Sequence, residues 1–180
     1  MQTFTPKRKH LFYTLVMLGI IPCVYLFSCK GKEAKPKTKA ELLAQNEWRG
    51  EVAEVTISSF VFNQKQDQNI STLILKFEKD GTFRLRNGNA PEQKGNWELL
   101  NNDQQIRLKN ANVIDFEPLK PLLPPGATLP PIPELFDVLE ITAENFKFQG
   151  KTNFSIPVQD FPMPIPIQID FKPNFVRNKN

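Results

Sequence analysis

Apolar and polar residues alternate with a period of two over most of the chain beyond residue 50. In residues 72–78 the apolar positions 73, 75 and 77 share one face, with polar residues at 72, 76 and 78, and in residues 55–61 the apolar positions 55, 57 and 61 share one face. Such alternation places the apolar side chains on one face of an extended segment, as in a half-buried β-strand. Further strands are predicted around residues 82–86, 97–99, 106–108, 138–141, 145–148 and 167–171.

Short turns separate these segments. Asp80-Gly81 follows the strand at residues 72–78, and Asp-Gly is a strong hairpin signal because glycine accepts a positive φ. A short helical turn is expected only at residues 40–46, where Leu42 and Leu43 would cap an apolar surface. About eight short strands are best buried when their sheet closes on itself. The sequence therefore predicts an all-β fold, an antiparallel meander of about eight strands that forms a small barrel.

Two proline-rich stretches, residues 118–133 and 157–166, interrupt the strands. Proline cannot donate to a β-ladder, so both stretches are predicted to be loops or polyproline-like crossings. Large apolar residues lie between the prolines, namely Leu122, Leu123, Leu129, Ile132, Phe161, Met163 and Ile165. We expect loops of this composition to pack across the barrel or to cover one of its ends.

The N-terminal segment has the layout of a secretory signal. A basic cluster at residues 7–10 precedes an apolar run at residues 11–27, which Gly19 and Pro22 interrupt. A retained transmembrane helix is the alternative. At roughly 17 residues the run lies at the lower limit for spanning a bilayer, and the glycine and proline weaken a helix. The sequence therefore favours a cleaved signal.

Leu26-Phe27-Ser28-Cys29 follows this apolar run and resembles the lipobox of bacterial lipoproteins. Phe27 departs from the usual small or β-branched residue. The resemblance implies a signal peptide at residues 1–28, cleavage after Ser28, and acylation of Cys29 with a fatty acid such as palmitate. It places the protein in the cell envelope as a lipid-anchored membrane protein. Position 30 is lysine rather than aspartate, which in enterobacterial-type sorting implies the outer membrane.

Residues 29–40 are expected to be the lipidated cysteine and a lysine-rich tether, because residues 30–40 contain no large apolar side chain. The lysines could rest against anionic headgroups or serve only to solubilise the linker. The formal net charge of +4 does not indicate a nucleic-acid partner. Removing Lys7, Arg8 and Lys9, which lie in the signal, from the 23 basic residues leaves 20 against 19 acidic ones.

The mature chain offers little catalytic chemistry. His10, the single histidine, and Cys23 lie in the expected signal, and Cys29 is expected to carry the lipid, so neither imidazole nor a free thiol would remain. A serine nucleophile with a histidine base is excluded, as is a zinc site of cysteine and histidine. We expect a non-enzymatic protein with no metal and no cofactor. The acidic pairs Asp115/Glu117 and Glu134/Asp137 could support a carboxylate-only hydrolase, but we interpret them as solvated charges.

The order of several short motifs is similar to that of the lipocalin-like domains of lipoproteins from Bacteroidetes-type bacteria. The motifs are Trp48-Arg49-Gly50, the hairpin at residues 75–83 with its Asp-Gly-Thr-Phe turn, Gly95-Asn96-Trp97, and residues 169–173. The resemblance covers most of residues 41–173 except the two proline-rich stretches. It implies a small lipocalin-like barrel, commonly without an assigned ligand, and we place this domain at residues 41–175.

Inward-facing residues of such a barrel can line a ligand cavity or simply fill the core. The candidates are Leu73, Leu75, Phe77, Phe83, Leu85, Trp97, Leu99, Ile106, Leu108, Phe146 and Phe148. The leading hypothesis is a membrane-anchored lipoprotein whose barrel binds a small apolar or amphipathic molecule. The alternative is an envelope interaction or structural module that uses the proline-rich loops. An exposed patch of Leu122, Leu123, Leu129 and Ile132 would favour the alternative.

Overall fold

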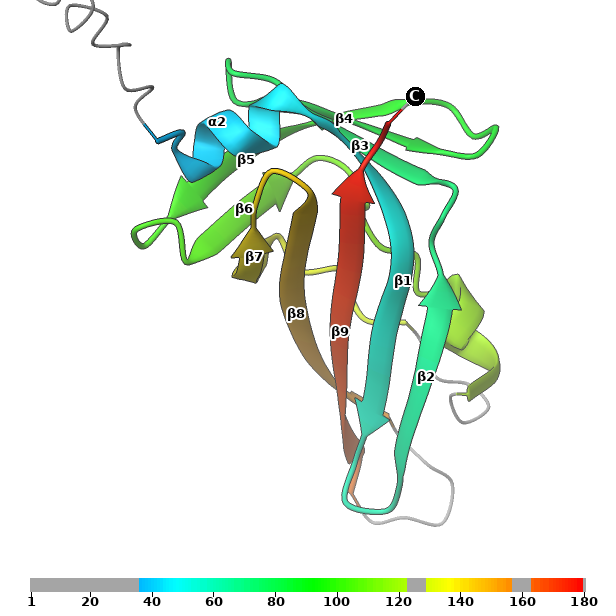
Figure 1. Cartoon of the computed structure of the whole chain (residues 1–180). Helices are drawn as coiled ribbons and strands as arrows, with labels where there is room; N and C mark the ends of the chain where they lie inside the picture. Colours follow the sequence, from blue (N-terminus) through cyan, green and yellow to red (C-terminus); the bar gives the residue numbers. More distant parts are fainter. Residues whose placement is uncertain (1–35, 123–128, 157–162, 180) are drawn as a thin grey trace, which may run out of the picture. The chain divides into compact units, whose positions relative to one another are not determined.

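The computed structural model describes residues 36–122, 129–156 and 163–179 (Figure 1). The expected signal peptide, Cys29 and most of the tether lie outside the described residues. No helix in the described ranges is both long and apolar enough to cross a membrane. Residues Lys37–Asn180 form a compact unit with its own hydrophobic core and hydrogen-bonded sheet, so this unit contains what it needs to fold alone.

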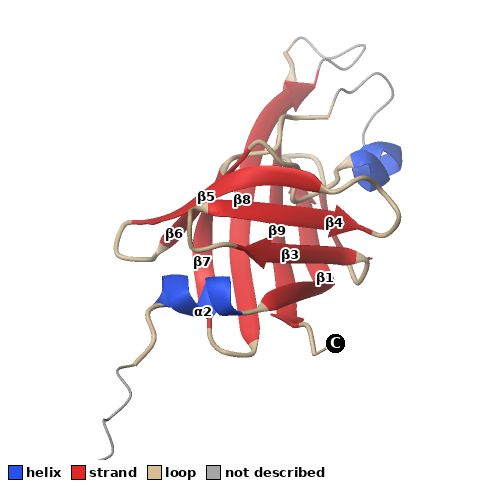
Figure 2. Cartoon of the chain, turned by 90° about the horizontal axis from the view of Figure 1, so that it is seen from above, coloured by secondary structure: helices blue, strands red, loops and turns tan. Residues whose placement is uncertain are grey.

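The described strands form one antiparallel sheet in which eight strands close into a barrel and one is extra (Figure 2). Pairing of β1 with β9 closes the barrel, and β2 is the extra strand. This confirms the predicted fold class. The strands are β1 Glu47–Ser58, β2 Asn63–Asn69, β3 Leu73–Phe77, β4 Thr82–Asn87, β5 Gln93–Leu100, β6 Gln105–Lys109, β7 Leu135–Ile141, β8 Asn145–Ile156 and β9 Ile165–Arg177.

Strand β2 was not expected from the sequence. β2 pairs with the second half of β1, while β3 pairs with the first half. The two strands β2 and β3 therefore lie one after the other along the same edge of β1. Its residues are NQKQDQN, and a search for alternating apolar residues cannot detect such a segment. Gln64, Gln66 and Gln68 lie opposite the buried Ile57, Val55 and Ala53 of β1. Directly opposite residues share a face of the sheet, so β2 presents glutamines to the inner face.

The helix α2, Lys39–Gln45, forms where a short helical turn was expected, and begins within the predicted tether. It starts there because Thr38 and Glu41 form a capping box. Leu43 is fully buried against the barrel, and its carbonyl accepts a hydrogen bond of 2.9 Å from Trp48 Nε1. The apolar contact and this bond fix the chain where it enters β1.

The first proline-rich stretch packs on the barrel, as expected for its described residues. Phe116 precedes it and is buried, with its ring 5.5 Å from that of Phe171 in β9. Pro130 is buried, and Leu129 and Ile132 are partly buried against the core. Between these parts lies the short helix η2, Glu117–Leu122. Of the second stretch, only residues 163–166 are described. The loop prediction is wrong for Ile165 and Pro166, which pair with the end of β8 as the first residues of β9.

Gly150 illustrates how closely the interior is packed. It lies directly opposite Phe171, and an added Cβ would overlap the Phe171 ring. We expect Gly150→Ala to lower the free energy of unfolding by about 1–3 kcal/mol, the usual cost of overpacking, measured by urea denaturation. The exposed neighbour Lys151 provides the control Lys151→Ala, which should change it by less than about 0.5 kcal/mol. Equal stability of the two variants would contradict this packing.

Candidate functional site

The candidate residues chosen from the sequence lie inside the barrel, where they form one continuous core. All are buried except Leu99, which is partly buried and packs against the same cluster. Their inward orientation agrees with the sequence pattern, but it does not by itself provide space for a ligand. Their role in binding stays a prediction.

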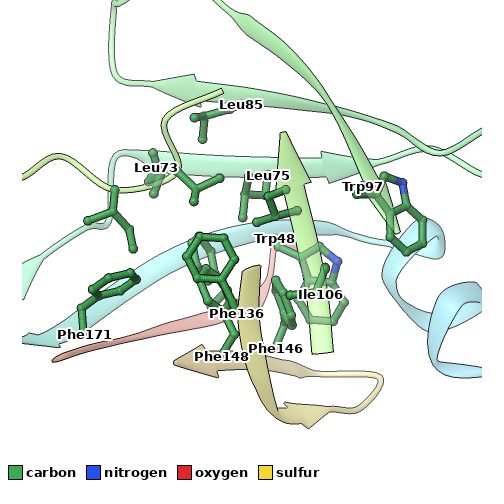
Figure 3. Packing of buried hydrophobic residues seen from close by; sticks show 14 of the residues in the cluster. Trp48, Leu73, Leu75, Leu85, Trp97, Ile106, Phe136, Phe146, Phe148 and Phe171 are labelled. Carbon is green, nitrogen blue, oxygen red and sulfur yellow. The ribbon is translucent and has the colours of Figure 1, made fainter. Parts of the chain in front are cut away.

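Aromatic rings occupy the centre of this cluster (Figure 3). The ring of Phe146 lies 5.2 Å from that of Phe148 and 5.6 Å from that of Phe77, and Phe77 lies 5.2 Å from Trp97. Phe136 continues the contact on the other side of Phe148, at 5.1 Å. Centroid separations of 4.5–7 Å are those of rings in direct contact. This part of the barrel is filled by its own side chains.

A pocket of about 310 Å³ lies away from these rings, between the junction of β2 with β3 and the segment that follows β6. Among the eleven candidates, only Leu73 lines it. The other walls come from β1, β2, the end of β4, β9 and the residues before and in η2. The lining residues are Ala53, Gln68, Asn69, Ile70, Thr72, Leu73, Asn87, Asn112, Val113, Ile114, Asp115, Pro118 and Pro173.

The pocket combines a buried apolar wall with an exposed polar rim. Ala53, Leu73, Val113 and Ile114 are buried, whereas Asn69, Thr72, Asn87 and Asn112 are exposed. Asp115 is the one charged residue in the lining. Such a surface fits a molecule with both an apolar part and hydrogen-bonding groups.

Hydrogen bonds in the turn after β2 and between the adjacent ends of β3 and β4 hold the rim in place. Asn69 Oδ1 accepts from the backbone N–H of Ser71 at 2.9 Å, and Asn87 Oδ1 accepts from Thr72 Oγ1 at 2.8 Å. Both bonds use the amide oxygen. The Nδ2 groups of the two asparagines have no hydrogen-bond partner among the described residues, so the rim offers amide donors to a ligand.

Leu73 aside, the sequence did not indicate these pocket residues, because most of them lie at strand ends or in loops, outside the alternating apolar pattern. The regular spacing of Gln64, Gln66 and Gln68 was the signal that could have revealed β2, since a period of two also marks a polar strand. Nothing in the sequence placed Asn112 and Asp115 beside β2. That proximity arises only when the chain after β6 packs across the barrel.

The acidic pairs have local structural partners. Asp115 Oδ1 accepts from the backbone N–H of Glu117 at 2.9 Å, and Asp137 Oδ1 accepts from Gln105 Nε2 at 3.0 Å. Within the described ranges, no group of three or more histidine, cysteine, aspartate or glutamate residues could hold a metal ion. The interpretation of these carboxylates as exposed structural charges is consistent with their surroundings.

The structure describes only some of the apolar loop residues proposed for a protein contact. Leu129 and Ile132 are half-buried and pack against the core cluster. Leu123 and the side chain of Leu122 lie outside the described residues. For the described pair, packing onto the barrel disfavours the exposed patch that the interaction hypothesis requires.

Comparison with known proteins supplies no relative from which a function could be transferred. No family model, no curated protein and no solved structure matches the chain. The function must therefore be inferred from the pocket and from the sequence itself.

Proposed function

We propose that the chain is a non-enzymatic, lipid-anchored protein of the cell envelope whose barrel domain binds a small amphipathic molecule. The ligand would occupy the pocket between the β2–β3 junction and residues 112–118. The observation that carries this proposal is the pocket itself, about 310 Å³ in volume, with an apolar wall and an amide-rich rim.

The size and chemistry of the pocket support a small ligand. A volume of a few hundred cubic ångströms is at the lower end for small-molecule sites, which are mainly apolar with a few polar groups that fix orientation. Val113, Ile114 and Leu73 would cover the apolar part of the ligand, and the asparagine amides would bind its polar part. The single carboxylate, that of Asp115, favours a neutral or cationic ligand over an anion.

The filled interior supports this location over a site in the centre of the barrel. Binding among the rings of Phe77, Phe146 and Phe148 would require several buried aromatic side chains to move. A tightly packed core resists such changes because each displaced ring loses its contacts. The open pocket requires no such rearrangement.

Membrane attachment through Cys29 is the second part of the proposal. Its support is the arrangement of a basic segment, an apolar run and Leu26-Phe27-Ser28-Cys29 in that order. The outer membrane is the expected location, from Lys30 after the cysteine. The lysines that follow would lie close to the headgroups.

Probe binding tests the pocket. Residues 30–180 should bind the neutral probe N-phenyl-1-naphthylamine with 1:1 stoichiometry, measured by fluorescence titration, and saturating probe should raise the thermal midpoint. Ala53→Leu would extend a buried side chain into the pocket and should weaken binding at least about tenfold, or 1.4 kcal/mol. Asn112→Trp should block the exposed rim without altering the core.

Ala143→Leu is the matched control, because Ala143 is exposed in the turn between β7 and β8 and is not part of the pocket lining. It should bind like the wild type. The pocket assignment would be wrong if the wild type failed to bind, or if both Ala53→Leu and Asn112→Trp bound as tightly as Ala143→Leu.

A further inference from the structure

The outer edge of β2 is unpaired in the described part of the chain. β2 stands at the end of the strand order, with β1 as its partner, and no other described strand pairs with it (Figure 1). Most of its residues are exposed, and it contains no proline. An edge strand without proline, a bulge or a covering element is available for pairing with another strand.

The register of β2 on β1 determines which backbone groups face outward. The backbone N–H of Ile70 donates to the Glu51 carbonyl at 3.2 Å, and that of Ser59 donates to Phe62 at 2.8 Å. Both bonds continue the β1–β2 register, so the even-numbered residues form the hydrogen-bonded pairs with β1. The odd-numbered residues therefore direct their N–H and C=O groups to the open edge; these are Asn63, Lys65, Asp67 and Asn69.

The sequence of β2, NQKQDQN, is complementary to itself when reversed. We propose that β2 pairs in antiparallel fashion with β2 of a second copy of this chain, with the two-fold axis at Gln66. In this register Lys65 lies opposite Asp67 of the second copy, Asn63 lies opposite Asn69, and Gln64 lies opposite Gln68. Every outward backbone donor and acceptor of one strand meets an acceptor or donor of the other.

Charge selects this register over its neighbours. If the two-fold axis were at residue 65, Lys65 of each copy would lie opposite Lys65 of the other. If the axis were at residue 67, Asp67 of each copy would lie opposite Asp67 of the other. Like charges directly opposite in a sheet are unfavourable, and opposite charges are favourable. The side chain of Lys65 is 62% exposed, so it is accessible to a second chain.

Asp67 supplies a reason for a second copy to bind. It lies directly opposite Glu54 of β1, so two carboxylates face one another on the outer surface. Lys65 of the same chain pairs with Glu54 at 2.8 Å, and this hydrogen bond and charge attraction lower the pKa of Glu54 and raise the pKa of Lys65. Lys65 of the second copy would lie beside Asp67 and offset the remaining repulsion.

The inner face provides a second, independent contact. The Nε2 atom of Gln68 is buried and has no hydrogen-bond partner among the described residues. A buried amide donor without a partner is costly. The register brings Gln64 of the second copy directly opposite Gln68, and side chains approach most closely in a pair of this non-hydrogen-bonded type. The Gln64 amide carbonyl is the acceptor that Gln68 lacks.

Charge reversal tests the register. Residues 30–180 should dimerise with rising concentration, up to about 1 mM, in sedimentation velocity, as expected for a small interface. Lys65→Asp and Asp67→Lys should each reduce dimerisation at least tenfold when studied alone. Mixed together, the two variants should form a heterodimer, because each variant then meets the opposite charge at both positions. The double variant K65D/D67K should dimerise like the wild type.

Lys147→Glu is the control for a charge reversal away from β2, because Lys147 of β8 forms a partly exposed ion pair with Glu140 of β7 at 3.2 Å. It should leave dimerisation unchanged. Amide exchange gives a second measure: the N–H groups of Lys65 and Asp67 should become protected with concentration, while that of Gln66 is protected throughout. A monomer at all concentrations, or failure of the two single variants to combine, would overturn the proposal.

Discussion

Phe146→Ala is expected to lower the free energy of unfolding by about 3–5 kcal/mol, the range for removing a buried phenylalanine ring. Phe146 is fully buried and its ring contacts those of Trp48, Phe77, Phe148 and Phe175 at 5.2–5.9 Å. Because these neighbours come from four different strands, the barrel cannot close around the lost ring without moving several elements. Urea denaturation of residues 30–180 measures the change.

Val61→Ala is the control, since Val61 is 53% exposed at the turn after β1 and should change stability by less than about 0.5 kcal/mol. Phe146→Leu should cost less than Phe146→Ala because it retains part of the volume. A loss below about 1 kcal/mol for Phe146→Ala would mean that the centre of the barrel is loosely packed. A loosely packed centre could hold a ligand itself, which would contradict the placement of the binding site outside it.

Cys29→Ala is expected to abolish lipid attachment. If Cys29 is the acylated residue, its thiol is the only point at which the lipoprotein pathway can begin, so the variant should remain an uncleaved precursor. Two or three acyl chains anchor a protein stably, at about 0.8 kcal/mol per buried methylene. Growth on labelled palmitate, followed by purification and N-terminal analysis, measures both lipid incorporation and the cleavage position.

Cys23→Ala is the matched control because Cys23 lies within the apolar run, which should be removed with the signal. It should incorporate palmitate and be cleaved between Ser28 and Cys29 like the wild type. Label retained in Cys29→Ala, or lost in Cys23→Ala, would refute the assignment of the lipobox. A retained transmembrane helix would instead give an uncleaved chain in all three proteins.

The strands that could be predicted are those with one apolar and one polar face. The alternation in β3 and β4 identified their inward residues, and the Asp-Gly turn between them has Gly81 at φ +85°, a positive φ that glycine adopts readily. The extra strand β2 was missed because its inner face carries glutamines. Strand β9 was predicted to end at residue 171 but continues to Arg177. It passes through Pro173, which lies opposite Ala53 in the ladder, and the sequence alone could not assign a proline to that position.

The candidate site was less predictable than the fold. Period-two alternation shows that Phe77 and Phe146 point inward, but the same pattern arises whether such rings surround a cavity or fill it. Only the contacts between rings from different strands distinguish these cases. The pocket joins β2 to residues near 115, about fifty positions apart in the chain, and their proximity depends on how the loop after β6 crosses the barrel.

Chemical-shift mapping of residues 30–180 with bound N-phenyl-1-naphthylamine tests the central claim most directly. If the ligand occupies the pocket, the methyl signals of Ile70, Leu73, Val113 and Ile114 should shift on titration, with intermolecular contacts from the probe to these groups. The methyl signals of Leu75 and Ile106, which lie in the filled barrel, should stay in place. Shifts and contacts at Leu75 and Ile106, with none at Val113 and Ile114, would contradict the account.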